Sequence, residues 1–69
     1  MRNKILNING SKYVFNYNFT ISDLMDYLGF NKNVIVIDYN GTIIEKNIWE
    51  FTSICDNDSL EILSIAGGG

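Results

Sequence analysis

The residues of this sequence that could do chemistry gather at its C-terminal end. The chain closes with Ala66-Gly67-Gly68-Gly69, and glycines without Cβ atoms can pass in extended form through a channel that a side chain would block. Such a tail would carry the terminal carboxylate into a partner's active site. A carboxylate is a poor electrophile, so a partner that uses ATP would have to convert it to an acyl-adenylate. The alternative is a frayed end or a cloning scar without a role.

Three other positions are weighed as candidate sites. We interpret Cys55 as a buried structural residue, because free cysteines are usually buried and no cationic neighbour in sequence activates it. Asp56 and Asp58 lack the central Gly and the closing Glu of a calcium loop, so we expect a solvated turn and no metal site. Trp49 is expected at the edge of the core rather than in a docking surface.

Composition narrows the possible functions further. The 69 residues allow one small domain, with 8 acidic against 5 basic residues, no His and one Cys. No basic patch can form for nucleic acid or an anionic membrane, and neither a disulfide framework nor an ordinary zinc site is available. The longest aliphatic run, Val34 to Ile37, is far too short to cross a bilayer. We expect a cytoplasmic protein that is not an enzyme, since no His can activate a nucleophile.

The first element predicted is a β-hairpin. Asn9-Gly10 suits a two-residue type I′ turn, which joins strands at 4–8 and 11–17. The loop length sets the pairs Ile8–Ser11, Leu6–Tyr13 and Lys4–Phe15. Leu6, Ile8, Tyr13 and Phe15 therefore share one face.

A short amphipathic helix should follow. Thr20 with Asp23 is typical of a helix N-cap and its capping box, and Gly29 suits the left-handed residue that ends a helix. Apolar residues recur at helical spacing at Ile21, Leu24, Met25 and Leu28. A helix of about two turns is not stable alone, so its apolar stripe must pack on the hairpin.

The second half of the chain predicts more strands. Val34 to Ile37 is β-branched throughout and favours a strand covered on both sides or nearly so, and Asn40-Gly41 begins a return through 42–44. Residues 45–51 are expected to be irregular with one helical turn, and 60–65 form the last strand. The order predicts an α+β fold of the β-grasp type, a mixed sheet of four to five strands with one helix across one face. We expect one domain over 1–66 and a flexible tail over 67–69.

The alternation of the last strand separates its apolar residues. If Leu60 and Ile62 face the helix, Leu63 and Ile65 lie on the open face of the sheet beside the tail. An apolar patch there would serve as a partner's docking surface, unless a loop covers it.

The whole chain resembles the ThiS family of sulfur carrier proteins. The residues that carry the resemblance are Asn9-Gly10, 20–25, 34–37, 45–49, 55–62 and the terminal glycines; the turn-prone Asn40-Gly41 departs from it. The resemblance implies that an E1-like enzyme of the ThiF type adenylates Gly69 with ATP, and that Gly67 and Gly68 form the threading segment. Sulfur from a cysteine persulfide would then give a thiocarboxylate, which a ThiG-type thiazole synthase uses for thiamine. No bound cofactor is implied.

Alternatives stay open on the sequence alone. The small subunit of molybdopterin synthase shares the fold, the tail and the chemistry, and a ubiquitin-like modifier would instead be conjugated to lysines. A plain β-grasp interaction module would make no use of its glycines.

Overall fold

The computed structural model describes residues 3–65, and the predicted tail, Gly67, Gly68 and Gly69, lies outside them. The elements in chain order are β1 (Lys4–Ile8), β2 (Ser11–Phe15), α1 (Ile21–Leu28), η1 (Lys32–Val34), β3 (Ile35–Tyr39), β4 (Thr42–Ile44), η2 (Lys46–Phe51) and β5 (Ser59–Ser64). The sheet has five strands in the order β2-β1-β5-β3-β4. β5 runs parallel to β1, and the other neighbours are antiparallel. The predicted mixed sheet with one α-helix is confirmed.

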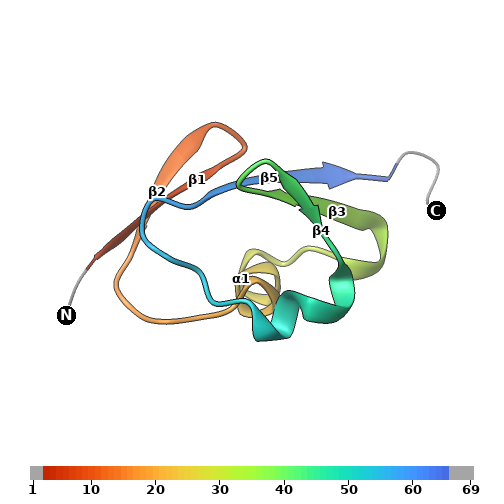
Figure 1. The fold of residues 1–69 in the computed structure, drawn as a ribbon, viewed down its shortest axis with the longest axis horizontal. Coiled ribbons are helices and arrows are strands. Elements are labelled where there is room, and N and C mark those ends of the chain that lie inside the picture. Colours follow the sequence, from red (N-terminus) through yellow and green to blue (C-terminus); the bar gives the residue numbers. More distant parts are fainter. Residues whose placement is uncertain (1–2, 66–69) are drawn as a thin grey trace.

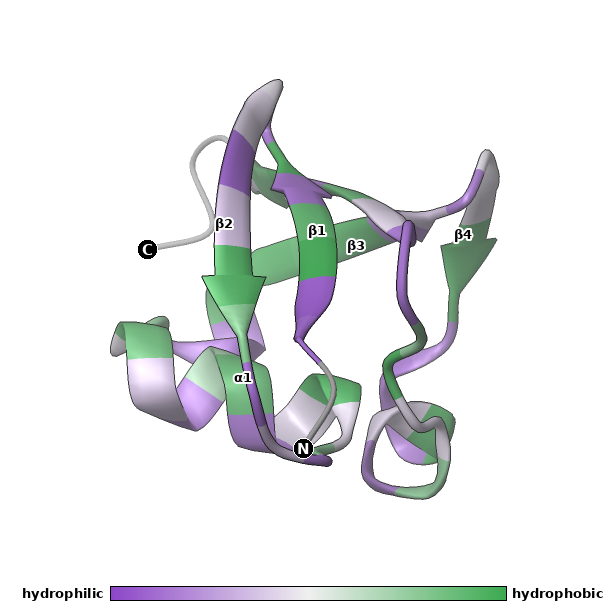
Figure 2. Cartoon of the chain, turned by 90° about the vertical axis from the view of Figure 1, so that its left-hand side faces the viewer, coloured by the Kyte–Doolittle hydropathy of each residue, from purple (hydrophilic) through white to green (hydrophobic). Residues whose placement is uncertain are grey.

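The layers explain which faces are buried. In Figures 1 and 2 α1 and the 3-10 turn η2 lie on the same side of the sheet, and no described helix covers the other face. The buried apolar side chains form one core cluster between these layers: Leu6, Ile8, Phe19, Ile21, Leu24, Met25, Ile35, Ile37, Trp49, Ile54, Leu60 and Ile62. The stripe predicted on the helix supplies its share of this core, with Leu28 partly buried beside it.

The N-terminal hairpin has the predicted register. Lys4 lies opposite Phe15, Leu6 opposite Tyr13 and Ile8 opposite Ser11. Asn9 and Gly10 have the positive φ angles, 51° and 84°, that a type I′ turn requires. Leu6 and Ile8 are buried, whereas Tyr13 is 43% exposed because β2 is an edge strand.

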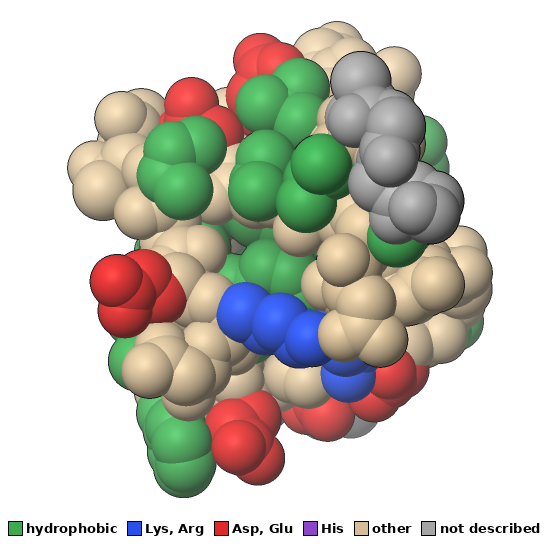
Figure 3. Space-filling model, turned by 90° about the vertical axis from the view of Figure 1, so that its right-hand side faces the viewer, with side chains coloured by type: hydrophobic (Ala, Val, Ile, Leu, Met, Phe, Trp, Pro, Cys, Tyr) green, Lys and Arg blue, Asp and Glu red, His purple; other side chains and the backbone are tan. Residues whose placement is uncertain are grey.

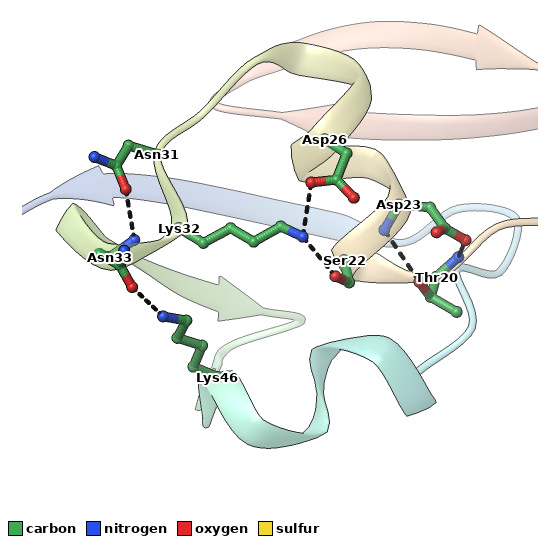
Figure 4. Close-up of polar contacts among 8 residues, drawn as sticks. All are labelled: Thr20, Ser22, Asp23, Asp26, Asn31, Lys32, Asn33 and Lys46. Atoms are coloured by element: carbon green, nitrogen blue, oxygen red, sulfur yellow. Dashed lines mark hydrogen bonds and ion pairs between the residues drawn. The ribbon is translucent and has the colours of Figure 1, made fainter.

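Both ends of α1 are capped by the residues that the sequence predicted. Thr20 Oγ1 accepts from the Asp23 N–H at 3.1 Å, and Asp23 Oδ2 accepts from the Thr20 N–H at 3.0 Å (Figure 4). Gly29 adopts φ 80°, and its N–H donates to the carbonyls of Asp26 and Met25. Side-chain and backbone caps satisfy the end groups that a short helix leaves open.

The strand predicted over Val34 to Ile37 is observed as β3 at Ile35–Tyr39. It begins one residue later and ends two residues later than predicted. Asn31 Oδ1 accepts from the Asn33 N–H at 3.0 Å and starts a 3-10 turn that takes in Val34 (Figure 4). β3 then buries Ile35 and Ile37, while Val36 on the opposite face is only half-buried. The strand was expected to be covered on both sides or nearly so; it is fully buried on the helix side and partly covered on the other.

Trp49 lies where the sequence placed it, against the core. Its side chain is 2% exposed, and Nε1–H donates to the Ile44 carbonyl at 3.1 Å. This bond fixes η2 to the end of β4.

Two lysines make polar contacts on the helix side of the sheet. Lys32 Nζ contacts Asp26 Oδ1 at 2.7 Å and Ser22 Oγ at 2.8 Å, and Lys46 Nζ donates to Asn33 Oδ1 (Figure 4). Across residues 3–65, no helix has the length and apolar character that a membrane span needs.

Candidate functional site

The base of the C-terminal tail is the central strand of the sheet. β5 lies between β1 and β3, and after its last residue the Ile65 N–H still donates to the Val34 carbonyl at 2.8 Å. The sheet therefore holds the chain in place up to Ile65. A fully extended chain spans at most about 3.6 Å per residue, so four residues that follow Ile65 can reach at most roughly 14 Å.

The open sheet face around this base is apolar and exposed. Leu60 and Ile62 are buried toward the helix, whereas Leu63 is 47% and Ile65 46% exposed, as the alternation predicted. Figure 3 looks at the end of the molecule where β5 ends. Its upper part, where the sheet lies, has hydrophobic side chains gathered together with acidic side chains at their border. The placement of Leu63 and Ile65 is confirmed, and their docking role stays a prediction.

The strand register adds four residues to this face that the sequence analysis did not select. Val36 lies opposite Leu63, and Asp38 lies opposite Glu61 on one side and Ile43 on the other. Directly opposed residues of antiparallel strands share a face. The pairing of β3 with β5 joins segments far apart in sequence, so only a correct register would have revealed this group.

Asp58 is not the solvated turn residue that we expected. It is 8% exposed, and its carboxylate accepts from the Tyr39 hydroxyl, from Asn40 Nδ2 at 3.1 Å and from the Cys55 N–H at 2.7 Å. A buried carboxylate needs such donors. Asp58 therefore ties the loop before β5 to the β3–β4 turn. Asp56 is exposed as expected, and its Oδ1 accepts from the Ile5 N–H at 2.7 Å.

The surroundings of Tyr39 predict that the stability of the fold depends on pH in the alkaline range. Burial, the hydrogen bond to Asp58 and the negative charges of Asp58 and Cys55 all raise the pKa of the Tyr39 hydroxyl above its usual value. The folded state thus favours neutral Tyr39, and this contribution is fully present below the unfolded pKa of about 10 and is lost as the pH rises beyond it. We expect the free energy of unfolding to fall above pH ~10.

This fall should be less steep in the Tyr39→Phe variant, which has no hydroxyl to ionise. Denaturant titrations at a series of pH values from neutral to strongly alkaline measure both slopes. Tyr27→Phe is the matched control, because Tyr27 is 69% exposed. Equal slopes for wild type and Tyr39→Phe would show that Tyr39 does not carry the effect.

Cys55 is exposed, so the expectation of a buried structural thiol is wrong. The loop turns its side chain outward while its N–H points to Asp58, which only the folded loop decides. Within residues 3–65, no group of three or more His, Cys, Asp or Glu side chains could hold a metal ion. The candidate site that the fold assembles is the group of apolar and acidic side chains on the open sheet face near the end of β5.

Comparison with known proteins places the chain in a family. The family model described as the ThiS family matches residues 4–69, which include the terminal glycines. The chain belongs to the ThiS family. A crystal structure of the thiamine biosynthesis protein ThiS from Geobacter metallireducens superposes with a TM-score of 0.81 at 24% identity, over 94% of this chain and 99% of that one. The fold is therefore the predicted β-grasp.

Two relatives of similar length and one much longer enzyme match this ThiS-family chain. A protein named ycf40 from Trieres chinensis is 40% identical over 62 residues, covering 90% of this chain and 85% of the relative. The sulfur carrier protein ThiS of Bacillus subtilis is 32% identical over 50 residues, covering 72% and 76%. A thiazole synthase from Paramagnetospirillum magneticum is 31% identical over 62 residues, which are 90% of this chain but 19% of that enzyme.

Proposed function

We propose that this chain is a sulfur carrier that supplies the sulfur of the thiamine thiazole, and that Gly69 carries it. The observation that carries the proposal is the family match through residue 69, on a chain whose last strand is the centre of the sheet. The enzyme binds the folded domain, and the reaction takes place at the chain end. The body needs no catalytic groups of its own.

The proposed reaction has three steps. An E1-like enzyme joins the Gly69 carboxylate to the α-phosphate of ATP and releases pyrophosphate, which gives an acyl-adenylate. The terminal sulfur of a cysteine persulfide attacks the acyl carbon, and AMP leaves. A second thiol cleaves the resulting acyl disulfide and is itself oxidised to a disulfide, which frees the thiocarboxylate. The sulfur of this group is a better nucleophile than a carboxylate oxygen.

The acceptor we propose is thiazole synthase. The match to a fifth of one thiazole synthase supports this choice, because a carrier-like segment and that activity occur there in one chain. The name of the Bacillus subtilis relative supports the sulfur-carrying role. No relative reported above is named for molybdenum cofactor synthesis or for protein conjugation.

Intact-protein mass spectrometry tests the proposal. The chain is incubated with a ThiF-type enzyme, ATP, a persulfide donor and a thiol reductant. We expect a mass gain equal to one oxygen replaced by one sulfur, and none when ATP is left out. A mass that stays unchanged under all conditions would refute the carrier function, and adducts on the lysines of other proteins would indicate a modifier.

The docking role of the open sheet face predicts a defect in Leu63→Asp. Leu63 is already 47% exposed, so the substitution should leave the unfolding midpoint nearly unchanged. A carboxylate in the centre of an apolar contact must be desolvated on binding, so the KM for the carrier in adenylation should rise by roughly tenfold or more.

The matched control is Val14→Asp. Val14 is 63% exposed and lies opposite Ile5 on the same sheet face, but on the edge strand β2 away from β5. It should leave the KM unchanged. Equal adenylation kinetics for Leu63→Asp and wild type would reject docking through this residue.

A further inference from the structure

Two carboxylates face each other on the open side of the sheet. Asp38 on β3 is the direct partner of Glu61 on β5, and side chains in such positions start from Cβ atoms about 5 Å apart. Like charges in this arrangement destabilise a sheet. The pair lies on the same face as Leu63, two residues further along β5.

Within residues 3–65, no ion pair or hydrogen bond is recorded for the carboxylate of Asp38 or of Glu61. Three lysines engage other groups: Lys32 binds Asp26 and Ser22, Lys46 binds Asn33, and Lys4 binds Asn18. Lys12 is on the edge strand β2, with β1 between it and β5. Asp38 Oδ1 is enclosed without a hydrogen-bond donor in the described part of the chain. The fold therefore keeps an unfavourable pair of charges that its own packing does not need.

The surroundings of the pair match a protein interface. Exposed apolar side chains adjoin it, with Leu63 at 47% and Ile43, opposite Asp38, at 58% exposure. Figure 3 shows acidic side chains beside the hydrophobic group at this end of the molecule. Apolar contact area with charged groups at its border is the usual anatomy of an interface.

We propose that Asp38 and Glu61 together bind an arginine side chain on the enzyme that adenylates the C-terminus. The inference rests on the proposed function and names the partner chemistry of that site. A guanidinium group presents several donors in a fixed fork and can bridge two carboxylates, whereas an ammonium acts as a point charge. Binding relieves the repulsion between the pair, so the free energy lost in the isolated carrier is recovered in the complex.

Charge complementarity favours the adenylating enzyme as the occupant. That enzyme binds ATP, and a triphosphate site requires positive charge nearby. The carrier has a net charge of −3, and Glu61 of its acidic pair lies on β5, the strand that leads to the tail. Long-range attraction would therefore bring the carrier to the enzyme with its reacting end in front.

The test uses the double variant Asp38→Asn/Glu61→Gln, which removes both charges and keeps the side-chain shapes. We expect the KM for the carrier in adenylation to rise about tenfold with kcat little changed. The KM of wild type should also rise with ionic strength, and that of the variant should depend on it less. The denaturant midpoint should be equal to or higher than that of wild type, because the repulsion is gone.

Glu45→Gln/Glu50→Gln is the control with the same change in net charge. Both residues are exposed and lie at η2, on the helix side of the sheet. A KM for Asp38→Asn/Glu61→Gln equal to that of wild type, or a rise equal to that of the control, overturns the inference while the carrier function stands. A rise seen only with thiazole synthase would also overturn it, since the pair would then bind the acceptor. If wild type itself gains no sulfur, the proposed function has failed, and the inference fails with it.

Discussion

A chain without Gly69 should gain sulfur at least ~100-fold more slowly than the full chain, because the reacting carbon no longer reaches its place. The truncated chain still ends in a glycine carboxylate, so it loses position rather than chemistry. Ile65 is held to Val34 by a backbone hydrogen bond, and the sheet cannot slide forward to make up the missing ~3.6 Å. The mass gain after incubation with the activating enzyme, ATP and sulfur donor measures the rate.

Two controls accompany the truncation. Cys55→Ser should gain sulfur at the wild-type rate, because we place the reaction at the chain end and not at this exposed thiol. The unfolding midpoint of the truncated chain should match that of wild type, since the described core lies within residues 3–65. A truncated chain that restores thiamine-independent growth to cells lacking the carrier would contradict the proposal.

Asp58→Ala should cost roughly 3 kcal/mol of unfolding free energy. The substitution leaves the Tyr39 hydroxyl, Asn40 Nδ2 and the Cys55 N–H, which meet at the buried Asp58 carboxylate in partly buried hydrogen bonds, without their acceptor. Each buried polar group left unsatisfied costs about 1–3 kcal/mol, although water that enters the space offsets part of this. A domain of this size has only roughly 3–10 kcal/mol of stability, so the variant should be partly unfolded near physiological temperature.

Asp56→Ala is the matched control for this prediction. Asp56 is exposed and accepts from the Ile5 N–H at 2.7 Å and from Asn57 Nδ2 at 3.5 Å, and water can replace both bonds. Its loss should cost about 1 kcal/mol. Chemical denaturation of both variants gives the comparison, and equal costs would show that burial of Asp58 is not what makes its hydrogen bonds important.

The elements that the sequence predicted correctly are those whose signals lie within a few residues. Asn9-Gly10 permits the positive φ angles of its turn, and Thr20 with Asp23 satisfies the first N–H groups of α1 through contacts three residues apart. The predicted start of β3 was wrong because the cap at Asn31 was missed. Asn31 caps a 3-10 turn that removes Val34 from β3.

Burial of polar and reactive residues could not be predicted in this way. Cys55 and Asp58 stand three positions apart, yet Cys55 is exposed and Asp58 is buried, the reverse of what their residue types favour. The donors that allow Asp58 to be buried come from Tyr39 and Asn40 in another part of the chain. The pairing of Asp38 with Glu61 likewise depends on the register of β3 against β5.

The sequence by itself determined the kind of protein: an α+β chain with capped, turn-defined elements, alternating faces on its last strand and a run of glycines at its end. These follow from backbone sterics and from periods of two and 3.6 residues, which act locally. Only the tertiary structure decided that the last strand is central, that Leu63 and Ile65 stay uncovered and that two carboxylates meet beside them. The reason is that strand order, register and burial depend on contacts between distant segments, which form only when the whole core assembles.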